Sequence, residues 1–591
     1  MAATETVPAT TTDPSTETSG ATSELLQRFE PALAELRGVV TDVVLLLRDD
    51  VPRVANSFAR RFPGATVRVL GARRELTPEE SAELDERVDY VLATSQQARV
   101  DYLMRTPRPQ VVIDAGNKKR SHKLSSFRQL FYFIRPGGCY GLAELDACKD
   151  PRYDDAAGEN VLDLLTEVVS VRAMATQGAE QARVMVQELA AASGDTVFRG
   201  SSAVVWRSEV SHFLKLRDWE ADEVLDYHHP QGWGEVLLQR PGFTFASRAT
   251  LESHGDGPIP SGPKTFEVPD RYLRRYRDVT CTARQIARIG DLVLPDSWRH
   301  PHQRVLNNRQ LIHSSPFFGR YLSRTAPTTT EELPGSFYYL DTELPGHFGH
   351  ITTDVISRVW GWELARREDP SVRPLVSKAR DDDEGLPGYQ QQIFTALGIP
   401  VDEVKVIGPR EAVVVETLYG PTPQLENPHY VDPELADVWA RLGERLPAGR
   451  PSQLDKIFIS RRPSTKRHCH QTPEIEAFFA SAGFTVLFPE DHSYVDQKMI
   501  FARARVIAGL GGSGMFNMMF NPRATVVIIS GSSYNAHNEH LIAAANGNEL
   551  HYFWGRSEIP MPPDRHSRAA FESSFTFDVR RHRRALRKII A

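Results

Sequence analysis

A glycine-rich turn within residues 509–520 constrains the fold of this 591-residue chain more than any other segment. The apolar run 505–510 leads directly into Gly511, Gly512, Ser513 and Gly514, and an apolar helical stretch follows. Glycine lets the backbone approach an anion closely, and the start of a helix offers free N–H groups to it. The turn therefore predicts a phosphate or diphosphate site, or a tight strand-to-helix connection without a ligand.

A loop rich in basic residues is expected at the same edge of this sheet. The strand 456–460 is followed by five basic side chains: Arg461, Arg462, Lys466, Arg467 and His468. Ligands of parallel sheets bind outside the carboxyl ends of the strands, where this loop and the glycine turn must both lie. Arginine suits a diphosphate because its planar group donates two parallel hydrogen bonds, although basic runs are also common on solvated faces.

The order of these motifs resembles the C-terminal half of glycosyltransferase family 61. The matching positions are Ile459-Ser460-Arg461, Arg467, Tyr494, Gln497, the glycine turn and Asn517. Upstream, the segment from Gly346 to Asp354 resembles the His-x-x-x-Asp segment of the family, so the resemblance covers roughly 295–554. Many members have His-Gly-Ala-Gly where this chain has residues 511–514, which puts in doubt a histidine beside the donor phosphates.

The family resemblance implies two facing Rossmann-like domains, the GT-B architecture, and transfer of a sugar from a nucleotide-sugar donor with inversion. His350 and Asp354 stand four residues apart and would face the same way on a helix. A histidine oriented by a carboxylate, or the carboxylate itself, would act as the general base for an acceptor hydroxyl. Alternatively, His350 packs at the start of a helix and Asp354 pairs with Arg358. His347 and Arg358 are further candidate substrate contacts.

The donor side offers more candidates around the glycine turn. Arg461 and Arg467 would neutralise the departing diphosphate together with the N–H groups of Gly512, Ser513 and Gly514. Asn517 either hydrogen-bonds the donor or fixes the loop, and Gln497 either reaches the same loop or faces solvent. Tyr534 and Asn535 follow the next strand and are candidate contacts for a ribose or sugar.

No metal is expected in this reaction. The chain has no Asp-x-Asp motif near a donor strand, and the acidic run 381–384 is typical of solvated charge. Arginine would replace Mg²⁺, so EDTA is expected to leave activity intact. The four cysteines have no metal-ligand spacing, so neither disulfides nor structural zinc are expected.

Charge and hydropathy predict a cytoplasmic protein. A net charge of −6 argues against a nucleic-acid partner. Neither a secretory signal nor a membrane-spanning segment is expected, so a lipid-linked acceptor would be reached from outside the bilayer. The basic stretch 580–588 either makes peripheral contact with the inner face of the membrane or forms a solvated terminal helix.

Residues 23–155 resemble a class I methyltransferase of the sugar O-methyltransferase kind. Residues 114–117 and 136–138 stand where that family has Asp-Asp-Gly-Ser-His and Pro-Gly-Gly. The early strand, however, runs into Arg48-Asp49-Asp50 where the family has Gly-x-Gly, and Lys118 or Lys119 replaces a motif histidine unless His122 compensates. We therefore expect a degenerate domain that keeps the fold and has lost S-adenosylmethionine.

The predicted fold class is α/β, with a GT-B-like pair of Rossmann-like domains preceded by a Rossmann-like methyltransferase-type domain. The predicted segments are a disordered tail (1–22), the methyltransferase-like domain (23–155), a helical connector with a strand-rich interlude (156–270), the acceptor-side domain (271–450) and the nucleotide-sugar-binding domain (451–591).

Together these features predict a glycosyltransferase without an essential cofactor. Its partners would be a nucleotide sugar and a glycan or lipid-linked glycan, in bacterial-type surface polysaccharide synthesis. Two alternatives are a bifunctional glycosyltransferase and sugar O-methyltransferase, and a non-catalytic scaffold that binds sugar nucleotides.

Overall fold

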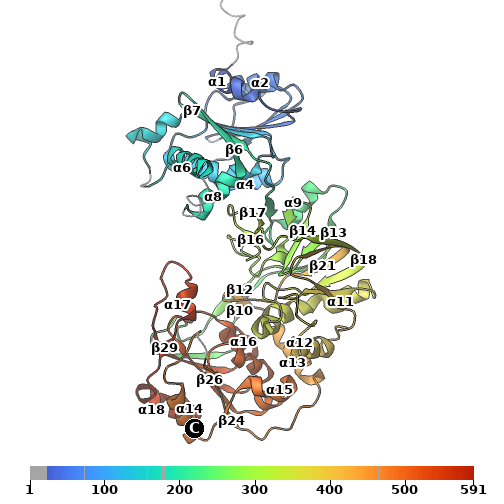
Figure 1. Cartoon of the computed structure of the whole chain (residues 1–591), viewed down its shortest axis with the longest axis vertical. Coiled ribbons are helices and arrows are strands. Elements are labelled where there is room, and N and C mark those ends of the chain that lie inside the picture. The colour runs from blue at the N-terminus through green and yellow to red at the C-terminus, as the bar shows by residue number, and fades with distance from the viewer. Residues whose placement is uncertain (1–22, 72, 156–157, 175–181, 464–465) are drawn as a thin grey trace, which may run out of the picture. The chain divides into compact units, whose positions relative to one another are not determined.

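The computed structural model describes residues 23–71, 73–155, 158–174, 182–463 and 466–591 (Figure 1). The predicted disordered tail, 1–22, lies outside these residues. The chain divides into two compact units, and each is described by itself. The first unit consists of the chain up to Phe213 together with the separate segment His313–Arg320. The second unit consists of Leu214–Ile312 and Tyr321–Ala591.

A seven-stranded sheet forms the centre of the first unit. Its strands are β1 (Asp42–Leu47), β2 (Thr66–Gly71), β3 (Val88–Leu92), β4 (Val111–Asp114), β5 (Cys139–Leu142), β6 (Ser193–Arg199) and β7 (Ser202–Arg207). The order is β3-β2-β1-β4-β5-β7-β6, and only β7 runs antiparallel to its neighbours. Every residue of β1 is buried, as an apolar strand covered on both faces requires.

The helices of the first unit connect these strands. They are α1 (Glu24–Leu33), α2 (Val51–Arg61), α3 (Pro78–Ala82), α4 (Gln96–Met104), α5 (Arg120–Leu130), α6 (Val161–Ala173) and α8 (Val184–Ala192). Helix α2 begins after Asp50, whose backbone is left-handed (φ 56°), and no glycine lies between β1 and α2. The strand order reverses between β1 and β4, which places the crevice of this Rossmann-like unit at their carboxyl ends.

The first sheet extends beyond the predicted boundary at residue 155. Strands β6 and β7, which fall in the predicted interlude 156–270, pair with each other and with β5. Ala203 and Val205 are buried there, so the apolar side chains of β7 complete the core of the first unit. Residues 156–270 therefore contribute strands to the sheets of both units.

The first domain of the second unit has a mixed sheet. Its main strands are β9 (Gly234–Arg240), β13 (Arg271–Thr282), β14 (Ile286–Ile289), β15 (Leu292–Val293), β18 (Thr329–Tyr339), β19 (Arg373–Ser377), β20 (Lys405–Ile407) and β21 (Glu411–Pro421). Four strands in the order β21-β18-β19-β20 are parallel and form the Rossmann-like part. Strand β13 runs antiparallel to β21, β14 and β9 and enlarges the sheet.

The segment after β18, which carries His350 and Asp354, is not one regular helix. It consists of α10 (Phe348–His350), a π-helical turn (Ile351–Val355), a 3-10 helix (Ile356–Gly361) and α11 (Trp362–Glu368). The Thr352 and Thr353 hydroxyls donate to the carbonyls of Phe348 and Gly349. Such side-chain bonds compete with the regular backbone pattern, and π-helical turns are frequent at functional sites.

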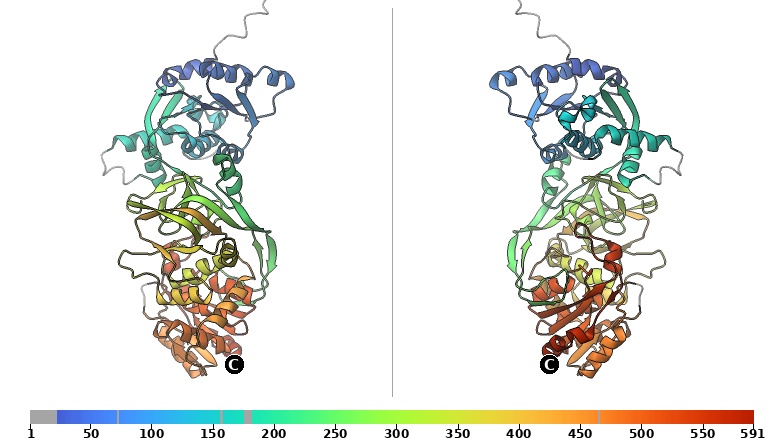
Figure 2. Two further views of the ribbon diagram at one scale, coloured as in Figure 1. Left: turned by 90° about the vertical axis from the view of Figure 1, so that its right-hand side faces the viewer. Right: turned by 90° about the vertical axis from the view of Figure 1, so that its left-hand side faces the viewer.

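The C-terminal domain of the second unit has a parallel sheet. Its strands are β11 (Thr250–His254), β24 (Lys456–Ile459), β25 (Thr485–Leu487), β26 (Val506–Leu510), β27 (Thr525–Gly531), β28 (Glu549–Ser557) and the antiparallel β29 (Phe575–Thr576). The order is β11-β28-β27-β26-β24-β25. Strand β11 comes from the predicted interlude, and the green segment before it runs along the side of this unit in Figure 2.

Helices cover both faces of the second unit's parallel strands. They are α12 (Gly388–Ala396), α13 (Leu435–Arg445), α14 (Thr472–Ser481), α15 (Tyr494–Arg503), α16 (Asn538–Asn546), α17 (Arg568–Glu572) and α18 (Val579–Ile590), and α9 (Ala221–His228) precedes them. The shorter strands of this unit are β10 (Phe243–Ala246), β12 (Thr265–Val268), β16 (Leu311–Ile312), β22 (Leu425–Glu426) and β23 (Tyr430–Val431). Strand β8 (Phe213–Lys215) begins on the last residue of the first unit's main segment, and β17 (Phe318–Tyr321) lies mostly in its segment His313–Arg320.

One continuous apolar core joins the two domains of the second unit. Ile351 and Val355 of the first domain share it with Met515 and Phe516 of the second. The fold class predicted from the sequence, α/β with Rossmann-like sheets, is confirmed. In the part of the chain that the structure describes, no helix is long and apolar enough to cross a membrane.

Candidate functional site

Two arginines meet at the glycine turn, at the carboxyl ends of β24 and β26. Arg461 Nη2 donates to the Gly511 carbonyl at 2.7 Å. A Cβ atom on Gly512 would lie 2.4 Å from Arg461 Nη2 and 3.4 Å from Arg467 Nη1. Gly512 also has a φ of 140°, which disfavours any side chain. The close approach of both guanidinium groups therefore requires glycine at position 512.

These two arginines differ from the other basic residues of their loop. Arg462 pairs with Asp491 at 2.6 Å, and Lys466 pairs with Glu572 at 3.3 Å. Within the described ranges, by contrast, neither Arg461 nor Arg467 forms an ion pair with a carboxylate. Burial, together with the charge of Arg467, lowers the pKa of Arg461 to about 10. Two neighbouring guanidinium groups that form no ion pair offer a site for an anion, although the carboxyl group of Glu539 interacts with both of them.

A buried carboxylate, Glu539, lies behind the glycine turn. Its Oε1 accepts the Gly512 N–H at 2.7 Å and the Tyr534 hydroxyl at 3.0 Å. Burial raises the pKa of Glu539 above its ordinary value. The Gly512 N–H, which the sequence predicts to bind phosphate, is therefore already occupied, and the turn continues as a 3-10 helix (Ser513–Phe520). No motif in the sequence signals Glu539.

Gln497 and Asn517 bind each other rather than facing an open surface. Asn517 Nδ2 donates to Gln497 Oε1 at 2.8 Å, and Gln497 Nε2 donates to the Pro489 carbonyl at 2.8 Å. Asn517 is fully buried. Of the two readings that the sequence leaves open for Asn517, the geometry agrees with fixing the loop.

Tyr534 and Asn535 have different environments after β27. Tyr534 is buried, and the Arg467 guanidinium packs over its ring at 5.1 Å from the centroid. Asn535 is only partly buried and lies 3.3 Å from His566 Nδ1 through its Nδ2 atom. Tyr534 therefore positions Arg467 and Glu539, whereas Asn535 stays accessible to a ligand.

The structure brings His350 and Asp354 together. His350 Nδ1 lies 2.7 Å from Asp354 Oδ2, and Arg299 Nε lies 3.0 Å from the same oxygen. Burial alone would raise the pKa of Asp354, but Arg299 and His350 outweigh it and hold the pKa well below the ordinary value. Arg299 has no motif in the sequence and is identified by the structure alone.

The histidines lie against the glycine turn. A Cβ atom on Gly349 would be 3.0 Å from Ser513 Cβ and 3.3 Å from His347 Cε1. The ring centroids of His347 and His350 are 5.0 Å apart. Partial removal of its ring from water lowers the pKa of His347, and the positive charges of His350 and Arg467 act in the same direction. The general-base candidates and the anion site therefore form one site.

Arg358 lies away from this site. Its side chain is 2% exposed, and its two terminal nitrogens donate to the carbonyls of Pro421 and Trp298, both at 3.1 Å. Its nearest carboxylate is Asp296 at 3.9 Å, so the predicted pair with Asp354 is not formed. Arg358 connects the helical segment to the neighbouring loops and does not face a ligand.

A partly buried histidine, His302, lies between two carboxylates. Its Nε2 lies 3.1 Å from Asp218 and its Nδ1 lies 3.4 Å from Glu426. Burial alone would lower the pKa of His302, but hydrogen bonds to Asp218 and Glu426 raise it to about 9. Burial alone would raise the pKa of Glu426, but hydrogen bonds to His300 and then His302 lower it to about 2.

The raised pKa of His302 predicts a loss of stability in alkaline solution. A folded-state pKa above the unfolded value stabilises the protein fully below about pH 6.5, and this contribution is lost as the pH rises through about 9. The shift corresponds to about 3 kcal/mol in the free energy of unfolding. Urea unfolding between pH 6 and 10 measures it.

The His302→Asn variant is the control for this pH dependence. The difference in unfolding free energy between wild type and variant should shrink as the pH rises. A difference that stays constant would contradict the assignment to His302.

The cysteines are buried, and most of the acidic run 381–384 is exposed. All four cysteines, Cys139, Cys148, Cys281 and Cys469, are buried and free. Asp381 and Asp382 are exposed, and the latter pairs with Arg380 at 3.2 Å.

The comparisons with known proteins identify the domain that carries this site. Residues 348–528 match the family Glycosyltransferase 61. A search of curated proteins gave no match. Similar solved structures include MycE methyltransferase from the mycinamycin biosynthetic pathway, in complex with Mg, SAH and mycinamycin VI (17% identity, TM-score 0.25, 32% of this chain and 54% of that one). A second crystal form with Mg and SAH has 15% identity and a TM-score of 0.25, covering 31% and 48%.

The chain thus spans about half the length of these methyltransferase structures, and at this TM-score the likeness supports no conclusion about the chain. The family match includes His350, Asp354, Arg461, Arg467 and the glycine turn. This protein carries a Glycosyltransferase 61 domain.

Proposed function

We propose that this glycosyltransferase transfers a sugar from a nucleoside-diphosphate sugar to a hydroxyl of a glycan, with inversion at the anomeric carbon. The observation that carries the proposal is the meeting of Arg461 and Arg467 at Gly512, with no ion pair to either among the described residues, beside the His350–Asp354 pair. An anion site next to a general-base candidate is the arrangement that a direct displacement of a nucleotide requires.

The donor's diphosphate would bind at the glycine turn. The guanidinium groups of Arg461 and Arg467 would each donate to phosphate oxygens and stabilise the negative charge that develops as the bond between the anomeric carbon and the diphosphate breaks. Tyr534 and Phe571 hold Arg467 in place, since their ring centroids lie 5.1 and 5.2 Å from its guanidinium carbon.

The acceptor hydroxyl would lose its proton to His350. Asp354 accepts a hydrogen bond from Nδ1 of His350, which leaves Nε2 as the atom that takes the proton. The ionised Asp354 then stabilises the resulting imidazolium, while Arg299 fixes the position of the carboxylate. The hydroxyl oxygen forms the new bond to the anomeric carbon on the face opposite the leaving group.

Several finer features belong to the same proposal. The two arginines would replace a divalent metal at the diphosphate, so added Mg²⁺ or Mn²⁺ should not change the rate. The first unit would bind no S-adenosylmethionine, because β1 passes through Arg48, Asp49 and Asp50 into α2 without a glycine. The reaction would take place in the cytoplasm, on a growing surface polysaccharide or its lipid-linked precursor.

A thermal-shift experiment tests the proposed donor. The intact protein is heated with UDP, GDP, TDP, CMP or S-adenosylhomocysteine in high excess, and a ligand at a hundred times its dissociation constant adds about 2.7 kcal/mol to the unit that it binds. One nucleoside diphosphate should raise the unfolding temperature, and the Arg467→Ala variant should lose this shift.

Two other outcomes of this experiment have clear meanings. Absence of any nucleotide shift in the wild type would contradict the proposed anion site. A shift with S-adenosylhomocysteine would show that the first unit binds this cofactor and would favour the bifunctional enzyme.

A further inference from the structure

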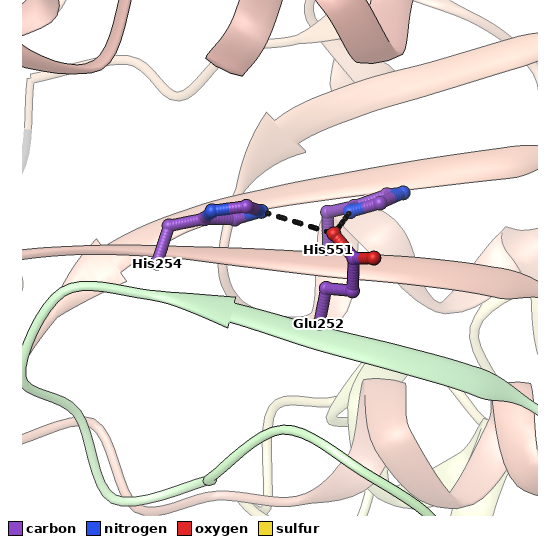
Figure 3. Close-up of side chains that lie close together, drawn as sticks. All are labelled: Glu252, His254 and His551. Atoms are coloured by element: carbon purple, nitrogen blue, oxygen red, sulfur yellow. Dashed lines mark ion pairs between the residues drawn. The ribbon is translucent and has the colours of Figure 1, made fainter.

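Two histidines and a glutamate converge on one face of the C-terminal sheet (Figure 3). Glu252 and His254 stand two residues apart on β11, so they share a face, and His551 on the adjacent β28 is the register partner of Glu252. Their ligand atoms all lie within 4.8 Å of one another. Pairing of β11 with β28 therefore creates a cluster that neither strand contains by itself.

The separations within this cluster suit a shared ion better than hydrogen bonds. Glu252 Oε2 lies 3.4 Å from His551 Nδ1 and 3.7 Å from His254 Nε2. Both distances exceed those of good hydrogen bonds. Ligands bound to a tetrahedral zinc ion at about 2.0–2.1 Å are themselves about 3.3–3.4 Å apart. The two separations between the carboxylate oxygen and the ring nitrogens are therefore close to those of ligands around one metal ion.

His551 is held with a free nitrogen facing the cluster. Its side chain is 3% exposed, and its Nε2 lies 3.0 Å from Glu549 Oε1. Glu549 is fixed in turn by the Thr525 hydroxyl at 3.0 Å. Nε2–H donating to a carboxylate leaves the lone pair on Nδ1, which is how metal-binding histidines are usually oriented.

The two ring nitrogens that face the cluster have no hydrogen bond. Among the described residues, His551 Nδ1 and His254 Nε2 are buried atoms without a hydrogen-bond partner. Buried polar atoms are normally satisfied, so each unsatisfied one needs an explanation.

We propose that Glu252, His254 and His551 bind one divalent transition-metal ion. Two imidazoles and a carboxylate in a roughly tetrahedral arrangement fit zinc best, with a fourth position for water. This set excludes the hard cations Mg²⁺ and Ca²⁺ as preferred occupants, because these favour oxygen ligands. No spacing motif in the sequence indicates this metal site, because its ligands come from two strands far apart in the chain. His254 and His551 are 297 residues apart.

The ion would fasten β11 to the edge of the C-terminal sheet. The segment that contains β11 reaches this sheet from the region before β13, and in Figure 3 both dashed lines end on the Glu252 carboxylate. Binding to the folded protein alone stabilises it by mass action. The proposal concerns stability and is independent of the proposed transferase reaction.

Zinc binding to the tag-free, full-length protein tests this site. After dialysis against a chelator, isothermal titration with ZnCl₂ should show one strong site, and zinc should raise the unfolding temperature. Co²⁺ in place of zinc should give the intense visible absorption of a tetrahedral site. Glu252→Gln and His254→Asn should each weaken binding by more than about 100-fold, exceeding the usual loss when only a hydrogen-bond partner of a ligand is removed.

The variants are chosen so that folding is not at risk. Glu252 and His254 lie on the edge strand, and their side chains are 55% and 25% exposed. The control is His582→Asn, a neighbouring histidine whose ring stacks on Phe577 and which is not part of the cluster. Unchanged zinc binding in both test variants, or no zinc bound by the wild type, would overturn the proposal.

Discussion

Replacing His350 by alanine is expected to lower kcat by about 10²- to 10⁴-fold while the nucleotide dissociation constant stays within about twofold of the wild-type value. The range is what a positioned general base contributes. His350 is the one histidine of the site that lies 2.7 Å from a carboxylate with a depressed pKa, and Asp354 therefore remains ionised and orients it. Single-turnover kinetics with titration calorimetry of the nucleoside diphosphate separate the two quantities.

His347→Ala is the matched control for this prediction. The centroid of the His347 ring lies 5.0 Å from that of His350, and the charge of Arg467 helps to lower the pKa of His347. Among the described residues, however, no carboxylate forms an ion pair with His347. We expect a change mainly in KM for this variant. If His347→Ala lost kcat and His350→Ala did not, the roles of the two histidines would be exchanged. If neither changed kcat, a base other than these histidines, such as Asp354 itself, would be required.

Patterns that depend on neighbouring residues were predictable from the sequence. The apolar strands, the glycine turn and the basic loop all follow from local composition, and the edge at which they meet follows from the rule for parallel sheets. The spacing of His350 and Asp354 also predicted their contact, even though the helix contains a π-helical turn, because residues four apart remain neighbours there.

Contacts between distant segments were not predictable in this way. Arg299 reaches Asp354 across 55 positions, and β11 joins β28 through backbone pairing that leaves no periodic signal in either strand. Glu539 is a third case, because an acidic residue at the start of a helix ordinarily indicates a solvated position. Its burial behind Gly512 results from tertiary packing. For Arg358 the sequence suggested too much. It lies near a motif and was a candidate substrate contact, but its side chain is buried.

Replacing Arg467 by alanine is expected to lower kcat/KM by about 10²- to 10³-fold, the usual effect of removing one donor that stabilises a developing negative charge. Unlike the neighbouring Arg462, Arg467 has no ion-pair partner among the described residues and points with Arg461 at Gly512. Steady-state kinetics with the nucleotide sugar identified by thermal shift measure the change. Arg467→Lys should recover only part of the loss, since a point charge cannot donate the two parallel bonds of a guanidinium group.

Arg462→Ala separates this specific role from the general charge of the loop. Arg462 is exposed and pairs with Asp491 and Glu490, so its removal lowers the positive charge of the loop by the same amount without touching the glycine turn. We expect less than a threefold change in kcat/KM for it. Similar losses in both variants would mean that the loop attracts the donor through its net charge, and the binding geometry assigned to Arg467 would then be wrong. A large loss in Arg467→Ala alone, accompanied by a weaker affinity for the nucleoside diphosphate, would place the diphosphate between Arg467 and Gly512, because no other described group on this loop changes between the two experiments.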